Sequence, residues 1–129
     1  MKKLKLIFLS FTLVLVTNTI FAQASPKIIA VVSKAQWCST CIKNENRVGQ
    51  QVISSVDTTK ITLLINDLSD KQTKNASAES FKKLGLKQGN FKSTGVITFI
   101  DASSKKILSS ISVAESSEKI KEAFANSLK

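Results

Sequence analysis

The stretch Trp37-Cys38-Ser39-Thr40-Cys41 decides the fold expected of this chain, because it holds the only tryptophan and the only two cysteines among 129 residues. An apolar, β-branched run from Ile28 to Val32 precedes it, and a segment with helical periodicity from Thr40 to Val56 follows it. Two thiols separated by two residues at a strand-to-helix junction can close a disulfide across one helical turn. The spacing therefore predicts a redox-active pair.

The position of Cys38 at the start of the predicted helix indicates which thiol reacts first. Unpaired backbone N–H groups and the positive end of the helix dipole favour a thiolate there. The thiolate is the form that attacks disulfides. We expect Cys38 to be the nucleophile and the more exposed and acidic thiol, and Cys41, one turn further on, to be the resolving thiol.

The pattern of apolar residues predicts an α/β domain with the element order β-α-β-α-β-β-α. A strand over 27–33 reads as buried on both faces, and the other strands are expected over 61–65, 96–101 and 106–113, the last two forming a hairpin. Residues 66–75 are expected to form a polar loop. Helices are expected over 40–56, over 76–84 with Ser77 as N-cap and Gly85 as terminator, and over 115–128.

These residues resemble the thioredoxin superfamily, whose signature is Trp-Cys-x-x-Cys after a buried strand. Ala35-Gln36-Trp37-Cys38 is similar to the Ala-x-Trp-Cys sequence with which the family's motif begins. Ser39-Thr40 stands where thioredoxin itself has Gly-Pro. The resemblance covers residues 23–129 and implies a thioredoxin-like fold, a central four-stranded mixed sheet flanked by helices. It also implies a thiol–disulfide oxidoreductase that is a monomer, needs no cofactor beyond the Cys38–Cys41 disulfide, and exchanges with protein thiols or disulfides and an upstream redox partner.

Three positions depart from the family pattern. Val32 stands where the family has a buried acid beneath the second cysteine, and the position of that acid's lysine partner falls near Ile65. Apolar side chains therefore lie beneath Cys41, and we expect this apolar surrounding to raise the pKa of the Cys41 thiol. Ile97 stands where the family has a cis-proline, and we expect a trans peptide before it. The resemblance places Trp37, Val96 and Ile97 at the substrate-binding surface, with Ile97 beside the disulfide and partly covering its sulfur atoms.

The first residues have the pattern of a secretory signal peptide. Lys2, Lys3 and Lys5 form a positive n-region, and the apolar run 6–16 is too short to span a bilayer. Ala22-Gln23-Ala24 has small residues at the spacing of a cleavage site. We expect residues 1–22 to be the signal peptide, with cleavage after 24 as an alternative, and residues 23–129 to be one exported domain, periplasmic or secreted. An uncleaved membrane anchor is the other reading.

The net charge of the expected domain indicates which classes of partner it favours. Without the three N-terminal lysines, 16 Lys and Arg stand against 9 Asp and Glu, a formal charge of +7. Such a charge favours acidic partners, membrane surfaces or solubility. Scattered lysines and few aromatic residues argue against nucleic acid.

Two other interpretations of the cysteines remain open. An inert structural disulfide would enclose only two residues and would remove little entropy from the unfolded chain. A zinc site needs about four ligands, and this chain has no histidine and no further cysteine. A metal or iron–sulfur cluster would therefore have to be shared between two chains. Either case would make the protein a non-enzymatic binding module.

Overall fold

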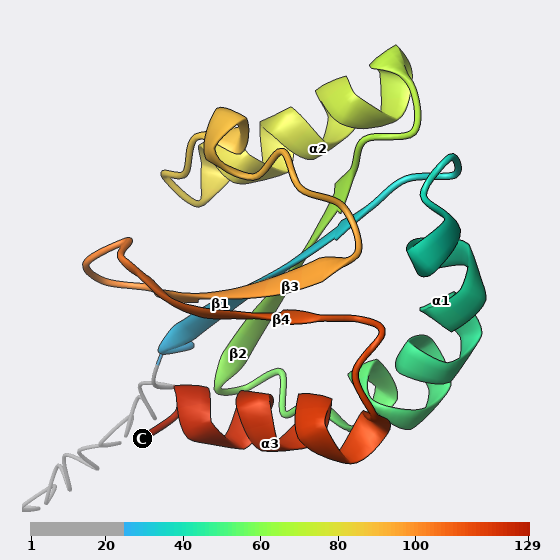
Figure 1. Cartoon of the computed structure of the whole chain (residues 1–129). Coiled ribbons are helices and arrows are strands. Elements are labelled where there is room, and N and C mark those ends of the chain that lie inside the picture. The colour runs from blue at the N-terminus through green and yellow to red at the C-terminus, as the bar shows by residue number, and fades with distance from the viewer. Residues whose placement is uncertain (1–24) are drawn as a thin grey trace, which may run out of the picture.

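The computed structural model describes residues 25–129, so the expected signal peptide lies outside the described part (Figure 1). Four strands form one mixed sheet in the order β2-β1-β3-β4. Strand β1 is parallel to β2 and antiparallel to β3, and β4 is antiparallel to β3. The strands are β1 (Ile28–Lys34), β2 (Ile61–Asp67), β3 (Val96–Asp101) and β4 (Ile107–Ser112).

Helices cover both faces of the sheet. Helices α1 (Ser39–Gln51) and α3 (Ser117–Ser127) lie on one face, and α2 (Lys71–Lys83) lies on the other (Figure 1). Short 3₁₀ helices, η1 (Ile53–Ser55) and η2 (Gln88–Asn90), follow α1 and α2. The predicted order and the thioredoxin-like α/β class are confirmed.

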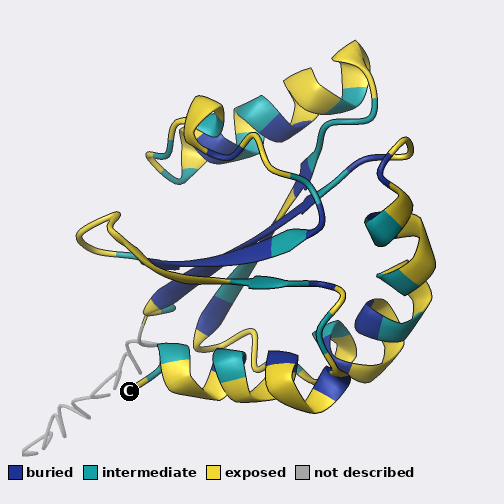
Figure 2. Cartoon of the chain, viewed as in Figure 1, coloured by how far each residue is buried: buried dark blue, intermediate teal, exposed yellow. Residues whose placement is uncertain are grey.

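Strand β1 occupies the centre of the sheet because its side chains are apolar on both faces. Ile28, Ala30 and Val32 belong to the core cluster that contains residues of α1 and α3. Ile29 and Val31 belong to the second cluster, which contains Phe81 of α2. Each fully buried aliphatic side chain contributes about 1.5 to 3 kcal/mol, and Figure 2 shows the inner strands buried between exposed helix surfaces. This double burial fixes the position of the motif that follows β1.

Helix α2 begins earlier than predicted. Its N-cap is Asp70, whose carboxylate accepts the Thr73 N–H at 2.8 Å, while the Thr73 side chain accepts the Asp70 N–H. This reciprocal cap starts the helix at Lys71 and replaces the expected polar loop and the cap at Ser77. The Ser77 hydroxyl instead accepts the Asp67 N–H at 2.9 Å, which ties α2 to the end of β2.

The ends of α1 and α2 are set by different signals. Helix α1 stops at Gln51 and continues as the short turn η1, rather than as one helix to Val56. Gly85 ends α2, as expected, with φ of +69°. The Leu86 N–H bonds to the Phe81 carbonyl at 2.9 Å in the pattern of a Schellman cap.

Candidate active site

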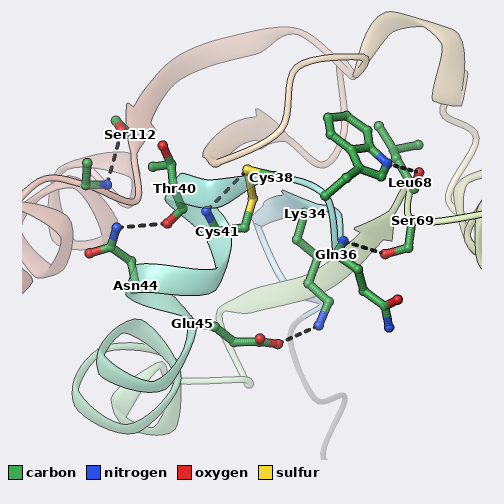
Figure 3. Close-up of a disulfide and its surroundings, with 12 residues drawn as sticks. Lys34, Gln36, Cys38, Thr40, Cys41, Asn44, Glu45, Leu68, Ser69 and Ser112 are labelled. Atoms are coloured by element: carbon green, nitrogen blue, oxygen red, sulfur yellow. Dashed lines mark hydrogen bonds and ion pairs between the residues drawn. A yellow bond between two sulfur atoms is a disulfide. The ribbon is translucent and has the colours of Figure 1, made fainter.

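The two cysteines form a disulfide at the first turn of α1 (Figure 3). Their Cα atoms are 5.2 Å apart. Cys38 has an extended backbone and is the N-cap of the helix, and its sulfur accepts the Cys41 N–H at 3.2 Å. A sulfur in this position satisfies one of the helix's unpaired N–H groups and lies at the positive end of the helix dipole. The same contact would stabilise a Cys38 thiolate after reduction.

Exposure does not distinguish the two cysteines. Each is 8% exposed in the disulfide form, so the expectation that Cys38 is the more exposed thiol is wrong for this state. Both pack with Ala35 and Leu68 in a small apolar cluster. The position of Cys38 at the helix N-terminus, rather than its exposure, therefore distinguishes the two cysteines in this form.

Trp37 lies on the surface beside the disulfide rather than in the core. Its side chain is 65% exposed, and its Nε1 donates to the Leu68 carbonyl at 3.3 Å. The neighbouring Gln36 N–H donates to Ser69 Oγ at 2.8 Å (Figure 3). Two hydrogen bonds thus hold residues 36 and 37 against the segment after β2, while most of the Trp37 surface stays exposed.

Gly95, directly before β3, borders the disulfide. A Cβ built on Gly95 would lie 3.6 Å from Cys38 Sγ and 3.5 Å from Thr40 Cγ2. Gly95 has φ of +73°, its N–H donates to the Ser33 carbonyl at 2.8 Å, and its carbonyl accepts the Val113 N–H at 2.9 Å. The sequence analysis did not select this residue. The available signal was a glycine placed directly before a β-branched run.

Ile97 does not lie at the substrate-binding surface, where the resemblance to the thioredoxin superfamily placed it. It is 0% exposed and lies in the core cluster with Val32 and Val48, so its side chain is inaccessible to a substrate. Its backbone pairs with Val32 on one side and Ile111 on the other. The expectation that Ile97 lies at the substrate-binding surface and covers the sulfur atoms is wrong, because Ile97 is fully buried and belongs to a different apolar cluster from the two cysteines. Val96 itself is half-buried.

The peptide bond before Ile97 is trans, as expected. No peptide bond among residues 25–129 is cis. An ordinary trans backbone therefore enters β3 next to the disulfide.

A groove of about 460 Å³ opens beside Cys41, between α1 and the ends of β1 and β2. Its lining combines apolar side chains with Gly49 and includes Cys41 itself. Val32 is part of this lining, so the site has no carboxylate where the family has its buried acid. The residues that give the groove its apolar character are Val32, Ala35, Ile42, Val48, Ile53 and Ile65.

Charged groups stand at the edge of this groove. Lys34 Nζ and Glu45 Oε1 form an ion pair at 2.8 Å, which joins the end of β1 to α1 (Figure 3). Burial alone would raise the pKa of Asp67, but hydrogen bonds from Ser69 and the charge of Lys34 hold it below its ordinary value. Asp67 is therefore ionised at neutral pH.

Arg47 fixes the active-site helix against the C-terminal part of the chain. Its guanidinium donates to the Val113 carbonyl at 2.7 Å, to Asn44 Oδ1 at 2.9 Å and to Ser117 Oγ at 3.0 Å. Val113 in turn bonds to Gly95, so α1 and the strand beside the disulfide are coupled through Arg47 and Val113.

Two negative findings concern residues 25–129. No group of three or more His, Cys, Asp or Glu side chains in this range is arranged to hold a metal ion. No helix in the same range has the length and apolarity needed to cross a membrane.

Solved structures with the same fold include several thiol–disulfide proteins. A thiol-disulfide isomerase from Corynebacterium glutamicum aligns with a TM-score of 0.54 and 12% identity over 81% of this chain and 82% of that one. MTB DsbF aligns with a TM-score of 0.51 and 13% identity over 80% and 82%. A secreted disulfide oxidoreductase from Mycobacterium tuberculosis aligns with a TM-score of 0.50 and 12% identity over 79% and 83%.

These similarities establish a thioredoxin-like fold for this chain. No protein-family model matches the sequence, and no curated protein matches it. The fold is thus shared with thiol–disulfide oxidoreductases, and the chain carries a CxxC disulfide at the first turn of α1.

Proposed function

We propose that this protein is an exported thiol–disulfide oxidoreductase that acts on protein thiols and disulfides through Cys38 and Cys41. The observation that carries the proposal is the position of Cys38, whose sulfur is the N-cap of α1 and accepts the Cys41 N–H at 3.2 Å. A hydrogen-bonded sulfur at a helix N-terminus makes a good attacking thiolate and a good leaving group.

The exchange proceeds in two balanced steps when the dithiol form acts as reductant. The Cys38 thiolate attacks a substrate disulfide, the Cys38–substrate S–S bond forms, and one substrate sulfur leaves as a thiolate that takes up a proton. Cys41 then loses its proton and attacks Cys38 Sγ. This step closes the Cys38–Cys41 disulfide, releases the second substrate thiol, and completes the transfer of two electrons to the substrate. The reverse sequence oxidises a substrate dithiol.

The surroundings of the disulfide suit a polypeptide substrate. Trp37 offers an exposed indole on one side, and the apolar groove beside Cys41 offers space for a substrate side chain on the other. Ile42, on the first turn of α1, and Ile65, on β2, are large apolar side chains that remain exposed at this groove. We assign the substrate-binding role to Trp37, to Gly95 and to the groove.

The insulin-reduction assay with dithiothreitol tests the proposal. Wild type should accelerate precipitation of insulin, Cys38→Ser should be inactive, and Cys41→Ser should accumulate a mixed disulfide with the substrate. Ser39→Ala is the matched control, because it changes the same exposed turn and leaves both thiols in place. A wild-type protein with a stable disulfide and no turnover in either the reductive assay or oxidative refolding would instead support the non-enzymatic module.

Export is tested separately. N-terminal sequencing of the protein recovered outside the cytoplasm should find Gln23 or Ser25 as the first residue. A protein that retains Met1 and fractionates with membranes would contradict the signal-peptide part of the proposal and leave the thiol chemistry untouched.

A further inference from the structure

Lysine side chains gather at the end of the sheet opposite the disulfide. The Ala102 N–H donates to the Lys27 carbonyl at 2.9 Å, and Lys105 Nζ donates to the Ala102 carbonyl at 2.6 Å. A Cβ on Gly85 would lie 3.6 Å from Lys105 Cε, which places the C-terminal end of α2 beside the β3–β4 turn. Figure 1 shows this turn, the end of α2 and the start of β1 together, far from the first turn of α1. We call this surface the lysine pole: Lys27, Lys82, Lys83, Lys105 and Lys106, all exposed.

The charge of the lysine pole is poorly compensated. The ion pairs of residues 25–129 join Lys34 to Glu45, Lys60 to Asp57 and Lys119 to Glu115, and none includes a residue of the pole. The carboxylate in the β3–β4 turn, Asp101, is held within its own turn by the Ser104 N–H at 2.7 Å and the Ser103 hydroxyl at 2.8 Å. The pole therefore keeps a net positive charge.

Apolar side chains adjoin the lysine pole. Ile107 and Leu108 directly follow Lys106 on the edge strand β4 and are 56% and 50% exposed. The pairing of β4 with β3 is irregular here, because Phe99 pairs with Ser109 and Ile100 pairs with Ile107, which leaves Leu108 without a partner on β3. Both exposed side chains therefore lie at this irregular end of the hairpin. Figure 2 shows the turn and the start of β4 as exposed. Lysines beside exposed aliphatic side chains form the composition that binds at a membrane interface.

We propose that the lysine pole docks on an anionic phospholipid bilayer, with the lysines on the lipid phosphates and the Ile107–Leu108 edge inserted at the headgroup boundary. In this orientation the disulfide, at the other end of the sheet, points away from the membrane toward water. The inference does not depend on the proposed redox activity, because none of its residues touches Cys38 or Cys41.

The composition of the pole favours lipid over nucleic acid. Single-stranded nucleic acid is bound by exposed aromatic side chains and arginines on which bases stack. The only arginine, Arg47, is bound to Val113 and Ser117 near the active-site helix, and Trp37 is at the disulfide end. The four phenylalanines within residues 25–129 are buried. Aliphatic side chains next to lysines instead match an interface of acyl chains and phosphates.

Vesicle co-sedimentation tests the proposal. All described strands, helices and both core clusters lie within residues 25–129, so the protein without residues 1–22 is used and the apolar leader cannot contribute. Vesicles of phosphatidylcholine mixed with phosphatidylglycerol should bind the protein, and binding should weaken with added salt. Vesicles of phosphatidylcholine alone should bind it far less.

Matched double variants locate the surface. Lys105→Gln with Lys106→Gln should weaken partitioning about 30-fold, because each lost lysine contact weakens it about fivefold. Lys43→Gln with Lys71→Gln makes the same charge change at the disulfide end and should have little effect. Ile107→Ser with Leu108→Ser should weaken binding about tenfold at constant charge, while circular dichroism confirms that each variant folds.

Three results would overturn the inference. Absence of binding to anionic vesicles at low salt is the first. Equal losses for the two lysine pairs would mean that only net charge matters. RNA binding as tight as vesicle binding, with no effect of the Ile107 and Leu108 changes, would make the pole a general polyanion surface instead.

Discussion

Gly95→Ala is the substitution that most directly tests the geometry of the site. The added Cβ would lie 3.6 Å from Cys38 Sγ and 3.5 Å from Thr40 Cγ2, which are ordinary van der Waals contacts. A collision is therefore not expected. The main energetic effect comes from the backbone, because Gly95 has φ of +73°, a conformation that side chains with a Cβ rarely adopt.

The magnitude follows from that backbone conformation. A non-glycine residue in the left-handed region costs about 1 to 2 kcal/mol. For a domain of this size, a loss of that order lowers Tm by roughly 5 to 10 °C. The new methyl group also lies against the sulfur of Cys38, a residue that is only 8% exposed, so an attacking thiolate has less room. We expect reduction of the disulfide by dithiothreitol to slow by at least about threefold, since exchange rates depend on access to the sulfur.

The chain supplies a matched control in Gly85→Ala. Gly85 has φ of +69°, and a Cβ there would lie 3.6 Å from Lys105 Cε, far from the disulfide. Both variants should show similar losses of stability in thermal unfolding of the oxidised protein, and only Gly95→Ala should slow disulfide reduction. If both variants are reduced at the wild-type rate, Gly95 does not border Cys38 as described.

Four further predictions concern stability, pH and thiol reactivity. Gly49→Ala should raise the free energy of unfolding by about 1 kcal/mol in urea titrations, because no atom lies within 4 Å of the added Cβ and alanine favours the helix; a loss of stability would contradict the open groove. Ile97→Ala should lower stability by about 2 to 5 kcal/mol, since it empties a fully buried position, and a wild-type Tm would place Ile97 outside the core. Hydrogen bonds from Ser104 and Ser103 lower the pKa of Asp101 from 3.8 to about 2, so the stabilising effect of its carboxylate is present above pH 4 and is lost as the pH falls toward 2. Asp101→Asn should therefore reduce the fall in the free energy of unfolding between pH 4 and pH 2. An unchanged fall would exclude Asp101 as its cause. Limiting iodoacetamide should label Cys38 before Cys41 in the reduced protein, because the sulfur of Cys38 is the N-cap of α1, and preferential labelling of Cys41 in peptide maps would reverse their roles.

The fold could be predicted from the sequence because its strongest signals are local. The β-branched run of β1 and the CxxC that follows it specify a buried strand joined to a helix, and two short β-branched runs separated by a polar turn, at β3 and β4, specify a hairpin. The start of α2 was missed because Asp70 and Thr73 act as a reciprocal pair, and propensity alone favoured the later serine. Side-chain identity at a cap therefore outweighed the polar character of residues 66–75.

The candidate site could be predicted only in part, because strand register is not a local property. The motif itself located Trp37, Cys38 and Cys41. Matching Ile97 to the cis-proline of the family placed the wrong residue beside the disulfide. Which residue of the third strand meets Cys38 depends on its pairing with Ser33 and Val113. A shift in register by one residue reverses the face on which a side chain lies, and no pattern within 95–101 reports that pairing.

Two residues beside the disulfide, Gly95 and Val32, act on different steps of the proposed exchange. Gly95 has no side chain, so the Cβ that would lie 3.6 Å from Cys38 Sγ is absent, which keeps open the approach used in the first attack. Val32 acts on the second attack, because its side chain stands where the family has a buried acid and cannot take the Cys41 proton. The carboxylates that also line the groove have other partners, since Glu45 pairs with Lys34 and Asp67 accepts hydrogen bonds from Ser69. Since the thiolate is the attacking form, attack by Cys38 should remain fast while release by Cys41 becomes slow. Slow release lengthens the life of the mixed disulfide, and a long-lived covalent complex gives a polypeptide time to occupy the apolar groove beside Cys41 before it is freed.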